Sequence, residues 1–148
     1  MNYLNDLSKS LDKYYVKLPA FPKDIKDFIV NVSPWLSLIF GVVAVISGIS
    51  FFGGFSFLSS FAFYPGERGY VFVGILSTAI LLIQGIIELM AFSPLKGRQA
   101  KGWNLLFYSL LLGVLSSIIT LNLSSVISSI IGALIGYYFL YQIKSYYK

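Results

Sequence analysis

The sequence contains neither cysteine nor histidine, although it is 148 residues long. Without these residues the chain can form no disulfide, no thiolate or imidazole metal site and no Ser-His-Asp triad. Acidic residues are also few: four aspartates that all precede residue 30, and two glutamates, Glu67 and Glu88. A hydrolase with a pair of catalytic carboxylates is therefore poorly supported. We expect no enzymatic activity, no metal and no cofactor.

Charge is scarce as well, since only 11% of the residues are charged, compared with about 25% in a soluble domain. The hydrophobic fraction is 57%, and the mean hydropathy is +0.78. The net charge is +5, but most of the later basic residues flank apolar segments. The expected partners are therefore the lipid bilayer and its anionic head groups rather than nucleic acid.

Four apolar segments are each about 20 residues long, the length that crosses the hydrocarbon layer as a helix. They are residues 34–52, 70–92, 103–121 and 123–143. The sequence thus predicts an all-α integral membrane four-helix bundle within residues 33–148, preceded by a cytoplasmic segment, 1–32. No secretory signal peptide is expected, because residues 1–30 lack a continuous apolar stretch.

The segment that precedes the spans has an amphipathic pattern. Within residues 3–18, leucines and tyrosines fall on one side of a helical wheel, and lysines and aspartates on the other. This pattern is typical of an interfacial helix among lipid head groups, although the same face could dock on this protein or on a partner. A short separate helix is expected over residues 23–32, followed by Ser33-Pro34 as the N-cap and first-turn proline of the first span.

Two further segments connect or flank the spans. Residues 55–69 are rich in aromatic residues and end in a Pro-Gly turn, so we expect a short interfacial or re-entrant piece there. Only Asn122 is left as a turn between the last two spans, which predicts that they form an antiparallel hairpin.

Each span carries a stripe of small residues, a pattern that lets a neighbouring helix approach closely. We expect these stripes to pack mainly within one chain, although a homo-oligomer or a contact with another membrane protein stays open. The glycines predicted to serve helix packing are Gly41, Gly48, Gly74, Gly85, Gly113, Gly132 and Gly136.

The distribution of lysine and arginine predicts the orientation, because positive flanks stay in the cytoplasm. The N-terminal flank has five basic residues, the second loop three and the C-terminal tail two. The first and third loops have one and none. Both termini are therefore expected to be cytoplasmic.

The span 70–92 contains Glu88, the one ionisable side chain inside any predicted span. Intramembrane acids often serve proton relays or cation sites. The interpretation we favour is a structural clasp in which Glu88 pairs with one of the basic residues of the following loop, Lys96, Arg98 or Lys101; a contact with a partner protein is the remaining alternative. Gln84, one helical turn deeper, indicates a polar site, and Asn104 and Tyr108 are its expected hydrogen-bond partners.

The run from Lys101-Gly102-Trp103 to Tyr108, together with the tail from Tyr141 to Lys148, resembles small uncharacterised bacterial four-span membrane proteins. The shared arrangement is a basic loop, a Gly-Trp helix start and a Tyr-Lys end. The resemblance covers about the last third of the chain. It implies the cytoplasmic membrane of a bacterium and supplies no catalytic residue.

Two functional hypotheses follow from these patterns. The first is a structural, accessory or interaction protein of the membrane. The second is a small oligomeric transporter or channel in which Gln84 and Glu88 line the path. Whether Glu88 faces a solvent-filled cavity would discriminate between the two.

Overall fold

The computed structural model describes residues 10–11, 14–15, 18–59, 68–120 and 122–148, without the side chains of 55–59 and 68–71. Apart from a few residues before α2, this part consists of four α-helices and a short 3-10 turn, η1. Their bounds are α2 Lys23–Ser59, α3 Arg68–Lys96, α4 Ala100–Ile119, α5 Leu123–Gln142 and η1 Lys144–Tyr146. Each α-helix contains a window long and apolar enough to cross a membrane. The predicted all-α, four-helix, multi-pass architecture is confirmed.

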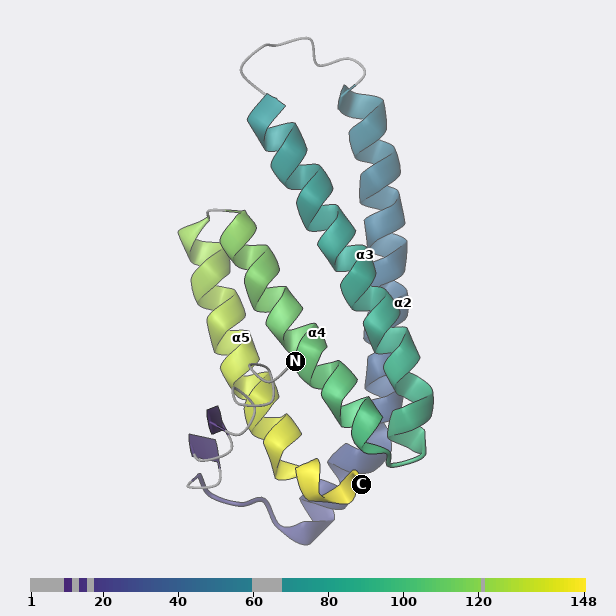
Figure 1. Cartoon of the computed structure of the whole chain (residues 1–148), viewed down its shortest axis with the longest axis vertical. Coiled ribbons are helices and arrows are strands. Elements are labelled where there is room, and N and C mark those ends of the chain that lie inside the picture. The colour runs from purple at the N-terminus through teal and green to yellow at the C-terminus, as the bar shows by residue number, and fades with distance from the viewer. Residues whose placement is uncertain (1–9, 12–13, 16–17, 60–67, 121) are drawn as a thin grey trace.

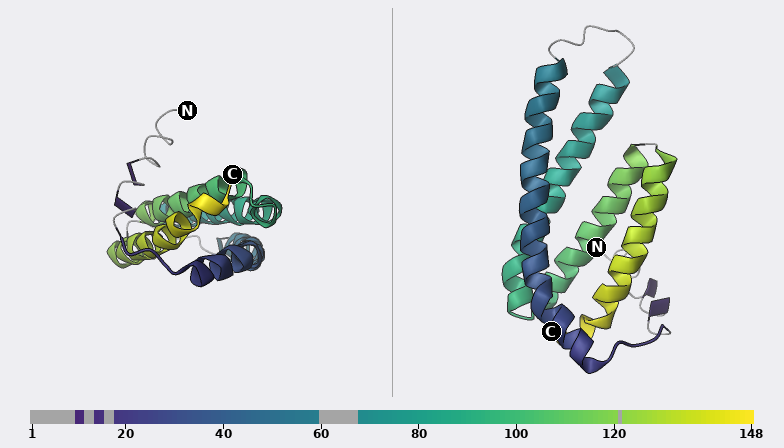
Figure 2. Two further views of the ribbon diagram at one scale, coloured as in Figure 1. Left: turned by 90° about the horizontal axis from the view of Figure 1, so that it is seen from below. Right: turned by 180° about the vertical axis from the view of Figure 1, so that it is seen from behind.

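The helices form two antiparallel hairpins, one long and one short (Figures 1 and 2). Helix α2 packs on α3, α3 on α4, and α4 on α5. The hairpins meet at the end that holds the start of α2 and the C-terminus, and they diverge toward the other end (Figure 1). With 20 residues each, α4 and α5 extend about 30 Å, which matches the hydrocarbon layer.

Helix α2 differs from the prediction, because it runs without interruption through Ser33 and Pro34. The expected separate helix over 23–32 and the Ser33-Pro34 cap are therefore wrong. Proline removes one backbone donor, yet nearby Ser hydroxyls and neighbouring helices make it tolerable in a membrane helix. Ser33 Oγ donates a hydrogen bond to the carbonyl oxygen of Ile29 at 2.6 Å, next to the Val30 carbonyl that lacks its usual donor at Pro34.

The segment 55–69 is also divided differently from the prediction. Residues 55–59 continue α2, and Arg68 and Gly69 begin α3. The remainder of this segment, 60–67, lies outside the described residues, as does most of the predicted interfacial helix 3–18. In the apolar surroundings of a membrane, a continuing helix satisfies backbone groups that a free loop would leave unpaired.

The α2–α3 contact brings two backbones together at glycines. A Cβ atom added to Gly41 would lie 2.9 Å from the amide nitrogen of Leu89 and 3.0 Å from the carbonyl oxygen of Gly85. One added to Gly85 would lie 3.1 Å from the carbonyl oxygen of Gly41. Further along, a Cβ at Gly48 would meet the Leu82 side chain at 2.5 Å. The carbonyl oxygen of Gly74 accepts a hydrogen bond from Thr78 Oγ1 at 2.8 Å, a bond within α3 and not part of this contact.

The α4–α5 contact is built from rings and hydroxyls. Trp103 donates its indole N–H to the carbonyl oxygen of Leu140 at 2.8 Å, and the Tyr137 hydroxyl donates to that of Phe107 at 3.2 Å. Toward the other end, Ser117 Oγ and Ser129 Oγ lie 2.5 Å apart. The predicted turn at Asn122 is confirmed, since its side chain accepts a hydrogen bond from the amide of Ser125 and caps α5.

The C-terminal tail is tied to the α3–α4 loop. The amide of Ala100 donates to the carbonyl oxygen of Lys148, and the amide of Lys148 donates to that of Arg98. Arg98 has a positive φ of 52°, which turns the chain sharply between the helices. Close to this turn, a Cβ at Gly102 would lie 2.6 Å from the amide nitrogen of Leu95. Both chain segments therefore lie at the same end of the molecule.

Candidate functional site

The Glu88 carboxylate lies where three helices meet. Its Oε1 atom accepts a hydrogen bond from Ser109 Oγ of α4 at 2.6 Å and one from Gln84 Nε2 of α3 at 3.3 Å. Its backbone carbonyl oxygen accepts a hydrogen bond from Ser37 Oγ of α2 at 2.5 Å. Ser37 and Ser109 are buried, with 3% and 2% of their surfaces exposed. Glu88 is thus anchored through both its side chain and its backbone.

The second carboxylate oxygen, Oε2, has a different environment. Glu88 is half-buried, and its hydrogen bonds to described residues engage only Oε1 and the backbone carbonyl. Buried side-chain atoms without a partner occur in the described residues only at Ser77 and Tyr147. Because Glu88 also lines an open groove, Oε2 can accept a hydrogen bond from a group outside the chain.

The basic loop does not clasp Glu88, which corrects the interpretation favoured from the sequence. Lys96, Arg98 and Lys101 are all exposed, and within the described residues none of them forms an ion pair with Glu88. Arg98 instead reaches Asn31 Oδ1 at 3.5 Å. The reason is axial distance: α3 continues to Lys96, which places the loop about 12 Å beyond Glu88 at 1.5 Å per residue.

The expected hydrogen-bond partners on α4 also differ. Asn104 is exposed, and Tyr108 packs edge-on against Phe107 with ring centroids 5.8 Å apart. Ser109 takes their place at Glu88. Gly113, one turn further along α4, lies beside Gln84, whose amide atoms would be 3.7 Å from a Cβ added there. Ser109 and Gly113 are four residues apart, as are Glu88 and Gln84, so a small-residue stripe pairs with a polar one.

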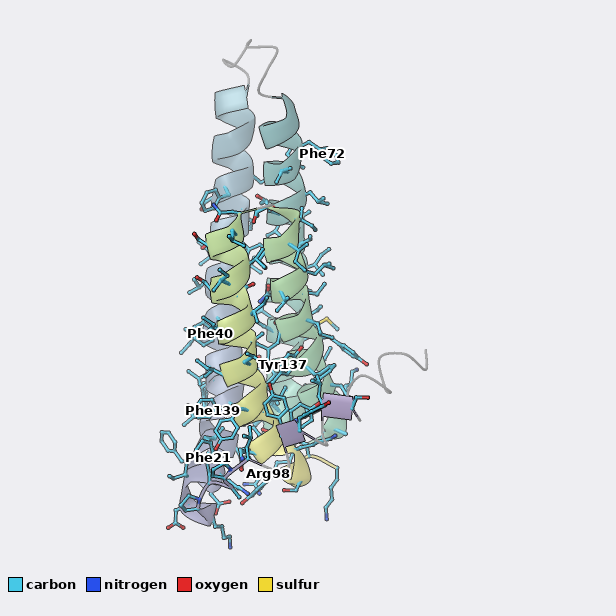
Figure 3. All side chains as sticks on the ribbon, turned by 90° about the vertical axis from the view of Figure 1, so that its left-hand side faces the viewer. Phe21, Phe40, Phe72, Arg98, Tyr137 and Phe139 are labelled. Carbon is cyan, nitrogen blue, oxygen red and sulfur yellow. The ribbon has the colours of Figure 1, made fainter. Side chains whose placement is uncertain are left out.

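A groove between α2 and α5 opens in front of Glu88. It encloses about 660 Å³, and its floor is formed by Glu88 together with α4. Its walls are mainly apolar and include Phe28, Leu36 and Phe40 from α2 and Ile135 and Phe139 from α5. Phe40 and Phe139 lie on the same side of the molecule (Figure 3). Several of these side chains are highly exposed, with Phe28 at 65% and Phe40 at 59%.

The two glycines of α5 that the sequence predicts for helix packing, Gly132 and Gly136, line the same groove. Nothing lies within 4 Å of a Cβ added to Gly132, whereas one added to Gly136 would meet the Leu110 side chain at 3.0 Å. Gly136 therefore serves packing inside the chain. Gly132 leaves a smooth, open strip of backbone in the groove wall, where another chain could approach closely.

The chemistry available at this site is that of one oriented carboxylate. It can accept a hydrogen bond from an N–H or O–H donor, pair with a cation or hold a proton. In the described part of the chain, no group of three acidic, His or Cys side chains is placed to bind a metal ion. Comparisons with protein families, curated proteins and solved structures found no match for this chain.

Proposed function

We propose that this protein is a membrane interaction protein that holds a transmembrane helix of another protein in the groove between α2 and α5. The observation that carries the proposal is the Glu88 carboxylate, which has one oxygen fixed by Ser109 and Gln84 and the other accessible in an apolar groove. A carboxylate in hydrocarbon is costly unless it is paired. An arriving helix with a suitable donor removes that cost.

The dimensions of the groove suit a helix that is embedded to about half its width. Its α2 wall, from Phe28 to Phe40, is about 18 Å long at 1.5 Å per residue. A volume of about 660 Å³ over this length corresponds to a mean cross-section of about 37 Å², roughly half that of a helix about 10 Å across. The other half of the guest helix would face lipid.

Charge complementarity defines the chemistry of the partner. Its helix carries a lysine, an arginine or another N–H donor at the depth of Glu88, and apolar side chains elsewhere on the contacting face. Small residues and hydrogen bonds hold membrane helices together, because lipid offers no hydrophobic drive for association. Gly132 lets the guest helix approach α5 closely, and Glu88 accepts the hydrogen bond that makes the contact specific.

As part of the same proposal, both termini lie in the cytoplasm. Its support is the gathering of basic residues at one end: Lys23 and Lys26 begin α2, Lys96 to Lys101 form the α3–α4 turn, and Lys144 and Lys148 close the chain. A reporter fused after Lys148 should report cytoplasm and one inserted near Gly66 the opposite side. The reverse result would contradict the orientation.

The test uses a matched pair of positions on α5. Leu134 and Ile135 are 55% and 54% exposed, but only Ile135 lines the groove, and the two lie about 100° apart around the helix. A photo-reactive amino acid is placed at either position in native membranes, with or without Glu88→Gln. We expect one protein adduct of defined mass at position 135, reduced at least fivefold by Glu88→Gln and retained with Glu88→Asp, and no such adduct at position 134.

Three results would contradict the proposal. They are the same adduct at both positions, an adduct at position 135 that does not depend on Glu88, and adducts with lipid alone. A proton or cation flux in proteoliposomes that Glu88→Gln abolishes would instead favour the transporter hypothesis.

A further inference from the structure

A second cavity lies at the basic end of the molecule, separate from the groove. It encloses about 530 Å³ between the chain that leads into α2, the second turn of that helix and the C-terminal end of α5. Lys26 and Lys144 both line it, together with Tyr15, Tyr141, Gln142 and Ser145. The described residues that line this cavity include no acidic side chain. Two cationic groups from opposite ends of the sequence thus converge on one space.

The rings beside the cavity fix the position of Lys144. Its Nζ atom lies 4.8 Å from the ring centroid of Trp103 and 5.2 Å from that of Tyr141, within the range of a cation–π interaction. Tyr141 in turn stacks on Tyr15 at 5.0 Å. The ammonium group is therefore held near the cavity rather than extended into solvent.

The opposite wall is held in place by hydrogen bonds from α5. Gln142 Oε1 accepts from the amide of Phe21, and Gln142 Nε2 donates to the carbonyl oxygen of Pro19, both at 3.1 Å. The Tyr138 hydroxyl donates to the same oxygen at 2.7 Å. Because these bonds tie residues 19–21 to α5, the cavity exists before any ligand arrives.

We propose that this cavity binds the phosphate group of an anionic phospholipid between Lys26 and Lys144. Lysine binds phosphate as a point charge, and each lysine near an anionic lipid surface contributes about 1 kcal/mol. Burial raises the pKa of the Tyr15 hydroxyl above its ordinary value, so this wall stays neutral and does not repel an anion.

A lipid fits this cavity better than a soluble phosphate because of what lies next to it. Phe139 of α5, five residues before Lys144, is 42% exposed and packs against Phe21 with ring centroids 5.5 Å apart. The cavity therefore lies where the apolar face of α5 meets the basic end. A head group held there can lay its acyl chains along α5.

Fluorescence of Trp103 provides the readout, because this indole touches Lys144. The chain has two tryptophans, so Trp35→Phe leaves Trp103 as the sole tryptophan. In reconstituted bilayers, brominated phosphatidylglycerol should quench Trp103 at lower mole fraction than brominated phosphatidylcholine. Lys26→Gln and Lys144→Gln should each reduce this preference about fivefold, the factor that one lysine is worth near such a surface, and Lys144→Arg should restore it.

Lys23→Gln is the matched control, since Lys23 is an exposed lysine one turn before Lys26 that does not line the cavity. It removes the same charge and should leave the preference unchanged. An equal loss in Lys23→Gln would mean diffuse attraction of head groups and would overturn the site. Displacement of the lipid by inorganic phosphate at constant ionic strength would overturn the choice of a lipid as ligand.

Discussion

The two hairpins solve the same packing problem with different chemistry. In α2–α3, glycines let the backbones touch, and the contact extends along the helices from Gly41 to Gly48. In α4–α5, large rings fill the space at the basic end, and hydroxyls meet at the other. Lipid provides no hydrophobic drive between helices, so both hairpins depend on close fit and hydrogen bonds. Substitutions in the two hairpins should therefore change the free energy of unfolding by different amounts.

The largest expected effect comes from removing a ring from the ring cluster of α4–α5, which consists of Trp103, Phe107 and Tyr137. Phe107 is 2% exposed and contacts the rings of Trp103 and Tyr137. Phe107→Ala should lower the free energy of unfolding by about 3 kcal/mol, because a buried phenyl ring leaves a cavity. Reversible unfolding in mixed detergent micelles measures this. Phe72→Ala, at a side chain that is 67% exposed, should cost little, and equal losses would contradict the ring cluster as the main contact.

A smaller loss is expected from adding a methyl group to the α2–α3 contact. Gly41→Ala should cost about 1–2 kcal/mol, because overpacking at backbone atoms outweighs the better helix propensity of alanine. Gly132→Ala has open space around the new methyl group and should be neutral or stabilising. Unfolding of the two variants under the same conditions makes the comparison. If Gly41→Ala were as harmless as Gly132→Ala, the two backbones would not be in contact.

The smallest effect concerns the hydroxyl pair of α4–α5. Ser117→Ala removes the contact with Ser129 and should cost about 0.6 kcal/mol, the average for polar contacts between membrane helices. Ser128, which is exposed on α5, provides the control substitution to alanine. A loss above 2 kcal/mol for Ser117→Ala would show that hydroxyls, rather than rings, dominate this hairpin.

The helices themselves could be predicted because hydropathy and length suffice to locate them. The uninterrupted course of α2 through Pro34 could not be predicted. In a soluble protein Ser33-Pro34 is typical of a helix start, whereas in lipid a continuing helix keeps its backbone groups paired. The partner of Glu88 was missed for another reason. Which residues of α3 and α4 lie opposite each other depends on how far α3 extends before the turn. The sequence shows a stripe of small residues on each span, but it does not show whether a serine in such a stripe, here Ser109, serves as packing or as a hydrogen-bond donor.

The pairing of Glu88 with Ser109 is the central claim, since it engages one carboxylate oxygen and leaves the other for a ligand in the groove that Glu88 lines. A double-mutant cycle on the free energy of unfolding tests it directly. Glu88→Met, which removes the acceptor oxygens at similar side-chain length, and Ser109→Ala should be coupled by about 1 kcal/mol, because they share a hydrogen bond. Glu88→Met and Lys101→Met should be additive, because these residues are not paired. Coupling with Lys101 and additivity with Ser109 would contradict the account and restore the clasp to the basic loop.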